Sequence, residues 1–164
     1  MLVHAIALKN YRNYESLTLT LDEGINIFLG ANAQGKTNFL EAVACLSDGK
    51  SFRTWRDSEL IRFGCESAFV RGLCEAQGRE HELTLTLNAG RKKKMTQNGS
   101  AVKSLAPYLA TVVFRPEDLE LISEGAAVRR RFLDRAIGQI RPKYASVAEE
   151  YARVYEHKTR ILRD

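Results

Sequence analysis

Residues 25–46 read Ile-Asn-Ile-Phe-Leu-Gly-Ala-Asn-Ala-Gln-Gly-Lys-Thr-Asn-Phe-Leu-Glu-Ala-Val-Ala-Cys-Leu and predict a strand, a loop and a helix in succession. Its first five residues form an apolar run, interrupted only by Asn26, that predicts a buried strand. The spacing of Phe39, Leu40, Val43 and Leu46 predicts a helix soon afterwards. Between them, Gly30–Thr37 matches the phosphate-loop pattern G-x-x-x-x-G-K-[ST] at every fixed position. The sequence therefore predicts an α/β fold with a nucleotide site where this strand meets this helix.

Each fixed residue of the loop has a physical role. Gly30 and Gly35 allow backbone conformations that a Cβ would penalise, so that successive N–H groups can converge on phosphate oxygens. Lys36 adds positive charge, the helix N-terminus attracts the same anion, and the Thr37 hydroxyl is placed to ligate Mg²⁺. The predicted nucleotide-binding residues here are Gly30, Ala31, Asn32, Ala33, Gln34, Gly35, Lys36, Thr37 and Asn38, with Thr37 also the metal ligand; a chance match by a glycine-containing turn is the alternative.

Length and composition indicate one ordinary globular domain. The chain has 164 residues, of which 45% are hydrophobic, enough to bury a core. No run of 18 apolar residues is present, and the N-terminal segment does not resemble a signal peptide, so we expect a cytoplasmic protein with no membrane association. The three cysteines are widely spaced and include no C-x-x-C pair that would suggest a metal or redox site.

Charge is distributed unevenly along the chain. Residues 1–90 hold 9 Lys and Arg against 11 Asp and Glu, whereas residues 91–164 hold 16 against 9. The second half is therefore basic, which makes nucleic acid a reasonable partner, although charge alone does not specify a function.

Hydrophobic periodicity predicts the remaining elements. Alternation predicts strands at Val3–Leu8 and Ser16–Leu21, so that three strands precede the first helix. A short helix is predicted within Asp57–Gly64, an antiparallel meander in about 65–103, and a return to the central sheet at Thr111–Phe114. Helices are predicted from Ala126 to Ile140 and from Pro142 onward. We expect an ATP-binding lobe over 1–125 and the start of a helical second domain over 126–164.

Several segments together resemble the RecF family of bacterial recombination and repair ATPases, relatives of the SMC and Rad50 proteins within the ABC class. The resemblance rests on five segments that span nearly the whole chain: Leu8–Tyr14, Gly24–Asn38, Gly49–Arg53, Phe114–Leu119 and Arg129–Asp134. The phosphate loop alone fits many families, but the combination is specific.

The resemblance implies an ABC-type head with a mixed sheet, an antiparallel β lobe and a helical domain. It further implies ATP and Mg²⁺ as cofactors, ATP-dependent homodimerisation of the full-length protein, and action on DNA at single-strand gaps. RecR and RecO are the implied protein partners in loading RecA, in DNA replication, repair and the SOS response.

The family's signature motif and Walker B carboxylates are not found after residue 120. We therefore expect an N-terminal fragment that has no catalytic residues of its own and binds ATP weakly if at all, while the full-length parent is a slow, DNA-stimulated ATPase.

Further candidate sites lie outside the loop. Arg12 is a candidate nucleotide ligand, since arginine can reach phosphate oxygens bidentately, and a solvated turn is the alternative. Arg91, Lys92, Lys93 and Lys94 form the candidate DNA-binding cluster, with a lysine-protected edge strand as the equally weighted alternative. Glu117 and Asp118 could contact Mg²⁺ or water, or cap a helix.

Two other functions are also compatible with the sequence. The first is the head of another SMC-like ATPase, with a coiled coil following the last helix. The second is a small P-loop metabolite kinase, which the three predicted strands before the loop and the basic second half disfavour.

Overall fold

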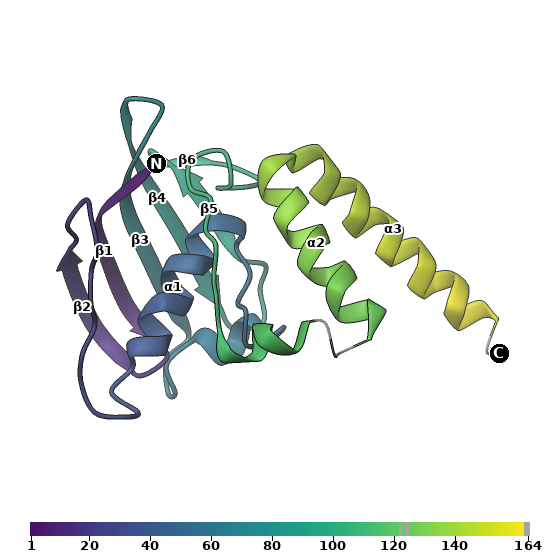
Figure 1. The fold of residues 1–164 in the computed structure, drawn as a ribbon, viewed down its shortest axis with the longest axis horizontal. Coiled ribbons are helices and arrows are strands. Elements are labelled where there is room, and N and C mark those ends of the chain that lie inside the picture. Colours follow the sequence, from purple (N-terminus) through teal and green to yellow (C-terminus); the bar gives the residue numbers. More distant parts are fainter. Residues whose placement is uncertain (122, 124, 163–164) are drawn as a thin grey trace. The chain divides into compact units, whose positions relative to one another are not determined.

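The computed structural model describes residues 1–121, 123 and 125–162 (Figure 1). The chain divides into two units, Met1–Val112 and Val113–Asp164. Each unit is described by itself. Among the described residues, no helix combines the length and apolar composition that crossing a bilayer requires.

The first unit is built on a six-stranded sheet in which every described pairing is antiparallel. The strand order is β2-β1-β3-β4-β5-β6. The strands are β1 (Leu2–Tyr11), β2 (Tyr14–Thr20), β3 (Ser67–Ala76), β4 (Arg79–Asn88), β5 (Lys94–Gln97) and β6 (Ser100–Ala101). The first two confirm the strands predicted near residues 3–8 and 16–21, and the last four form the predicted antiparallel meander.

One face of this sheet forms the core because apolar side chains alternate along its strands. Val70 on β3 pairs directly with Leu85 on β4, and both are fully buried. Ile6 and Leu8 of β1 extend the same apolar surface. Period-two alternation thus gives the sheet one buried face, as the sequence predicts.

Helix α1 (Lys36–Asp48) packs on that face, over β3, β4 and β1 (Figure 1). Leu46 lies against Gly72, where an added Cβ would come within 2.7 Å of the Leu46 Cδ1 atom, so glycine permits the close helix–sheet approach. The helix ends at Asp48 and is capped by Gly49, whose φ of 71° places it in the left-handed region and whose N–H donates to the Cys45 carbonyl at 2.9 Å. Cys45 is buried in the core, as predicted.

Two predicted strands are wrong. The residues of Ile25–Leu29 form no strand, and Ile25, Ile27 and Leu29 are at least 75% exposed. Thr111–Phe114 is likewise irregular rather than a strand of the sheet. An apolar run becomes a strand only where a neighbour accepts its backbone hydrogen bonds, and no described strand pairs with either segment. Two described strands, and not three, precede α1.

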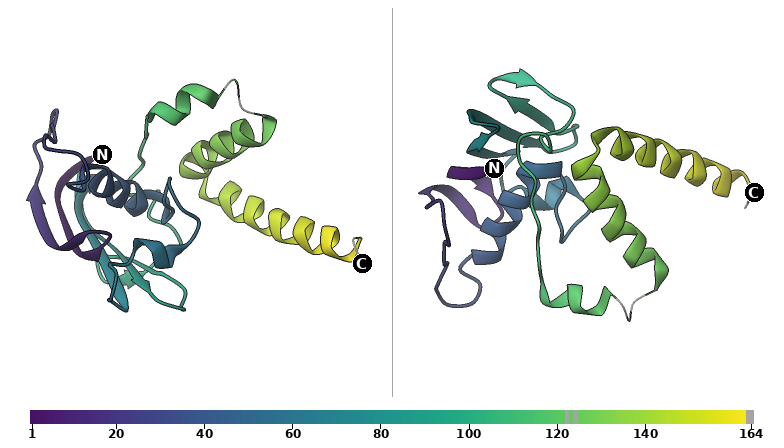
Figure 2. Two further views of the ribbon diagram at one scale, coloured as in Figure 1. Left: turned by 90° about the horizontal axis from the view of Figure 1, so that it is seen from below. Right: turned by 45° about the horizontal axis from the view of Figure 1, so that its top comes forward.

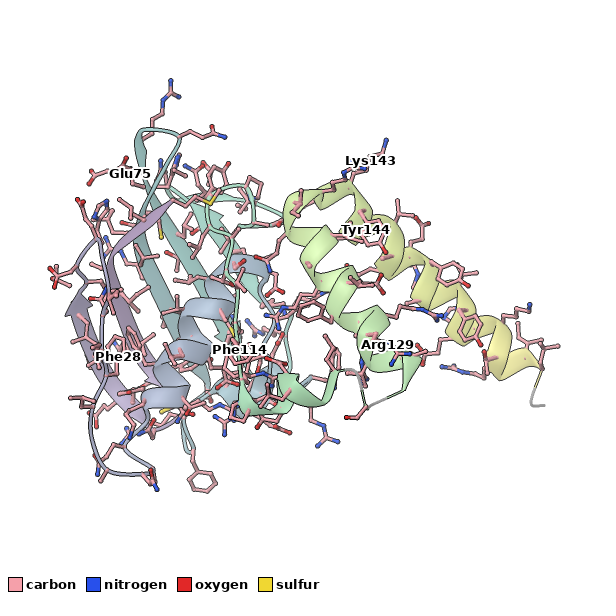
Figure 3. All side chains as sticks on the ribbon, viewed as in Figure 1. Phe28, Glu75, Phe114, Arg129, Lys143 and Tyr144 are labelled. Carbon is pink, nitrogen blue, oxygen red and sulfur yellow. The ribbon has the colours of Figure 1, made fainter. Side chains whose placement is uncertain are left out.

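Phe28 is the member of the 25–29 run that packs inward. Its ring lies 4.7 Å from that of Phe39, between centroids, and it packs against the core (Figure 3). The predicted helix within residues 57–64 is a single 3₁₀ turn, η1 (Asp57–Leu60), after which Ile61 forms an isolated bridge with Tyr11.

The second unit contains the 3₁₀ helix η2 (Pro116–Leu121) and the helices α2 (Ala126–Ile140) and α3 (Pro142–Ile161), which follow the predicted bounds (Figure 2). The two long helices pack against each other, with Ala145 close to Gly138. At the start of α3 the Tyr144 hydroxyl donates to Asp134 at 2.5 Å, and this bond raises the pKa of Tyr144 (Figure 3).

Candidate functional site

The phosphate loop leads directly into the N-terminus of α1. Gly30, Ala33 and Gly35 have φ values of 150°, 65° and 103°. Gly35 is also closely surrounded, because a Cβ there would lie 2.7–2.9 Å from Asn13 and Tyr14 side-chain atoms. Among the described residues, the N–H groups of residues 31–35 donate to no other main-chain group, so they remain available for an anion.

Lys36 folds back across this loop. Its Nζ atom donates to the carbonyl oxygens of Gly30 and Ala31, at 2.6 Å each. The ammonium group is thus held over the loop, beside the positive end of the α1 dipole. Thr37, the predicted Mg²⁺ ligand, follows in the first turn of α1 with an exposed side chain. The backbone donors, the ammonium and the hydroxyl fit a nucleotide phosphate with its metal ion.

Protein side chains in the described ranges do not form a metal site by themselves. This part of the chain contains no group of three or more His, Cys, Asp or Glu side chains that could hold an ion. A cation at Thr37 would therefore depend on nucleotide oxygens, as is usual for Mg²⁺.

Asparagine side chains tie the β1–β2 turn to the loop. Asn13 Nδ2 donates to the Gln34 carbonyl at 3.3 Å, and Asn13 Oδ1 accepts from Asn38 Nδ2 at 2.8 Å. Asn38 in turn accepts from Arg53 at 2.7 Å. Asn38, a predicted nucleotide-binding residue, thus connects the turn, the loop and the segment after α1.

Arg12 is held by a carboxylate that sequence reasoning missed. Its Nε and Nη2 atoms donate to Glu41 Oε2 and Oε1 at 2.9 and 2.8 Å, and Nη1 donates to the Glu59 carbonyl at 2.8 Å. The hydrogen bond to Glu41 raises the pKa of Arg12. Glu41 is 0% exposed. A signal did exist in the sequence: Glu41 is an acidic residue within the otherwise apolar stretch of α1.

A depression of about 700 Å³ adjoins this network. Its lining includes Arg12, Asn13, Asn38, Arg53 and Ile61. Asn13, which lines the depression, also donates to the Gln34 carbonyl of the phosphate loop, and Asn38 donates to Asn13. The depression therefore lies next to the loop in the first unit.

The predicted DNA-binding cluster is divided by the structure. Lys93 forms an ion pair with Asp57, with Nζ 3.1 Å from Oδ2, and is partly buried. Arg91, Lys92 and Lys94 have exposed side chains at the β4–β5 turn and the start of β5. Three of the four predicted cations are therefore exposed, and Lys93 anchors the turn to η1.

Asp118 pairs with a neighbouring arginine. Its Oδ2 atom accepts from the Arg115 N–H at 2.8 Å, and Oδ1 accepts from Arg115 Nη2 at 2.8 Å. These contacts hold the pKa of Asp118 below its ordinary value, chiefly through the side-chain hydrogen bond. The Asp118 carboxylate thus accepts from the backbone N–H of the residue just before η2, which is a helix-capping contact. The side chain of Glu117 is exposed.

The family model described as AAA ATPase domain matches residues 1–114, which include the loop, α1 and the Arg12–Glu41 pair. The chain belongs to this family. It is also 37% identical over 166 residues to a DNA replication and repair protein RecF of Alkaliphilus oremlandii, and 41% identical over 167 residues to one of Bacillus cereus strain G9842. In each case the match covers 99% of this chain and 46% or 44% of the relative, so the chain spans less than half the length of these relatives.

The chain is also similar to solved structures of RecF. A structure described as the recombination mediator protein RecF-ATP in the RecFOR pathway superposes with a TM-score of 0.90 at 36% identity, covering 99% of this chain and 44% of that one. The SMC head domain from Thermotoga maritima gives a TM-score of 0.54 at 21% identity, over 63% of this chain and 39% of that one, and shows similarity of fold alone. The predicted resemblance to the RecF family and the predicted fold class are confirmed.

Proposed function

We propose that this chain is the ATP-binding part of a RecF-like DNA repair ATPase. The observation that carries the proposal is the position of Lys36, whose ammonium group lies across the phosphate loop at the N-terminus of α1. Its hydrogen bonds there go to carbonyl oxygens of its own loop, and a phosphate chain is a stronger acceptor for it. The backbone N–H groups of residues 31–35 would bind the same phosphates, and Thr37 would ligate Mg²⁺.

The depression beside the loop is the proposed place for the nucleoside. It is linked to the loop through the hydrogen bond from Asn13 to the Gln34 carbonyl, and its volume of about 700 Å³ is ample for a base and ribose. Arg12 and Arg53 line it and supply N–H donors, and Ile61 supplies an apolar contact. In this arrangement Arg12 would donate hydrogen bonds to the nucleotide from the edge of the depression.

The wider function follows from the resemblance to RecF and belongs to the whole protein. We propose that the protein dimerises with ATP, acts on DNA at single-strand gaps in the cytoplasm, and assists RecA loading together with RecR and RecO. Slow, DNA-stimulated hydrolysis would then require a carboxylate from outside the site described above.

Comparison of nucleotides tests the proposal directly. Because Lys36 and the loop donors address the phosphate chain, ATP should bind at least roughly tenfold more tightly than AMP, a difference of about 1.4 kcal/mol. Equilibrium titration with both nucleotides in Mg²⁺ measures the ratio. Equal affinities for ATP and AMP, or no binding of ATP at millimolar concentration by the complete protein, would contradict the proposal.

The DNA surface is testable through its salt dependence. Replacing Arg91, Lys92 and Lys94 together by alanine should weaken DNA binding and reduce the slope of log K against log salt, by about 0.9 for each phosphate that the variant no longer neutralises. Lys93→Ala is the matched control, because its ammonium group is already paired with Asp57. An unchanged slope in the triple variant, or an equally large effect of Lys93→Ala alone, would show that this cluster does not bind DNA in the proposed way.

A further inference from the structure

Glu41 carries a carboxylate that is fully removed from solvent. Burying such a group is costly unless its oxygens are paired and hydrogen-bonded. Here both oxygens are used: Arg12 donates to each of them, and the Ser51 hydroxyl donates to Oε1 at 2.5 Å. Arg53 Nη1 approaches Oε2 to 3.7 Å. Four donor groups from three side chains therefore converge on one carboxylate.

These partners come from segments distant in sequence. Arg12 lies in the β1–β2 turn, with a φ of 51°, and its N–H donates to the Leu60 carbonyl at 2.8 Å. Ser51 follows α1, and its Oγ accepts from the N–H groups of Arg53 and Thr54 at 2.8 and 3.1 Å. Glu41 thereby fixes the turn and the segment after the helix to α1 itself.

A second set of contacts connects Glu41 to the phosphate loop. Asn38 lies three residues earlier on the same face of α1 and joins Arg53 to Asn13. Asn13 continues to the Gln34 carbonyl of the loop. Three of the side chains that line the depression, those of Arg12, Asn13 and Arg53, are thus contacted by Asn38 or Glu41 of α1.

We propose that Glu41 is a positioning residue of the nucleotide site: it fixes the Arg12 guanidinium at the edge of the depression and leaves some of its N–H groups for the nucleotide. An arginine has five N–H groups, and the bonds to Glu41 and Glu59 use three of them. One N–H on each terminal nitrogen remains, in an orientation set by the carboxylate. This inference rests on the proposed ATP-binding function.

Three variants of the complete protein test the inference. Glu41→Gln keeps the size of the side chain but cannot accept from Arg12 with both atoms, and Arg12→Lys keeps the charge but loses the planar fork. Each should weaken binding of a fluorescent ATP analogue roughly tenfold, a decrease in affinity of the size seen when a hydrogen-bond partner that orients a binding group is removed. The double variant should bind no more than about twofold worse than either single one, because both remove the same oriented group.

The readouts separate positioning from folding. Ser47 is the matched control, because it is equally buried on α1 but lies beyond the site. Ser47→Ala should lower the thermal midpoint and leave ATP affinity within about twofold of wild type. If Glu41→Gln does not fold, Arg12→Lys and Ser51→Ala decide. The first removes the two-bond contact of the guanidinium with the carboxylate, and the second removes the bond to Oε1. Both should weaken ATP binding.

The outcomes distinguish this inference from the proposed function. If Lys36→Ala leaves ATP binding unchanged, the proposed function fails. If Lys36→Ala weakens binding strongly while Glu41→Gln, Arg12→Lys and Ser51→Ala bind as wild type or more tightly, the positioning role alone fails. Fully additive effects of Glu41→Gln and Arg12→Lys would also overturn it, because independent groups, and not one positioned group, would then contact the nucleotide.

Discussion

Lys36→Ala should weaken ATP binding by at least about thirtyfold, or about 2 kcal/mol, the scale expected when hydrogen bonds to a charged group are removed. The ammonium group lies 2.6 Å from two loop carbonyls, directly over the backbone donors of the proposed phosphate site. Its removal deletes both the charge and the donors that would meet the phosphate chain, while the backbone of the loop stays in place. Equilibrium titration with ATP and Mg²⁺ measures the decrease in affinity.

Lys9→Ala provides the comparison for a change of net charge alone. Lys9 is exposed on β1 and lies outside the loop and the depression. Its replacement should alter ATP affinity by less than about twofold, since exposed charges are screened by solvent and salt. A similar decrease in both variants would mean that Lys36 acts through overall charge, and that the proposed phosphate contact is absent.

Leu46→Ala should destabilise the first unit by about 3 kcal/mol, the middle of the range for truncating a buried leucine. Leu46 is 0% exposed and lies against Gly72 at the centre of the helix–sheet contact. The cavity left behind cannot collapse easily, because the surrounding side chains come from rigid strands. Urea titration followed by circular dichroism measures the change in unfolding free energy.

Leu40→Ala is the matched control on the same helix. Leu40 is 51% exposed, so truncation removes less buried surface and opens no internal cavity. It should cost less than about 1 kcal/mol. If the two variants were equally destabilised, the core would not lie where α1 meets β3 and β4.

Local sequence was sufficient to locate the phosphate loop, because its chemistry is carried by consecutive residues. The glycines, Lys36 and Thr37 act through backbone geometry and short reach, and the helix that follows is encoded by its own apolar spacing. The strands β3 and β4 could also be predicted, because their apolar residues alternate. On β4, Leu83, Leu85 and Leu87 are fully buried in the core.

The structure of Ile25–Leu29 could not be predicted from the sequence alone. Its composition is that of a buried strand, but a strand also requires a neighbour, and no local pattern states which neighbour is present. The prediction of a strand at Thr111–Phe114 is wrong for the same reason. The composition of both segments favours a strand. Neither forms one, because no described strand pairs with its backbone.

The phosphate-loop motif, the helix that follows it, most of the antiparallel strands and the resemblance to RecF could thus all be predicted from the sequence. The partners of the charged side chains could be found only in the folded chain. It paired Arg12 with Glu41 across 29 positions of sequence and Lys93 with Asp57 across 36. The physical reason is that a motif is set by neighbours along the chain, whereas a buried or paired charge takes its partner from whichever segment the folded chain brings within hydrogen-bonding distance.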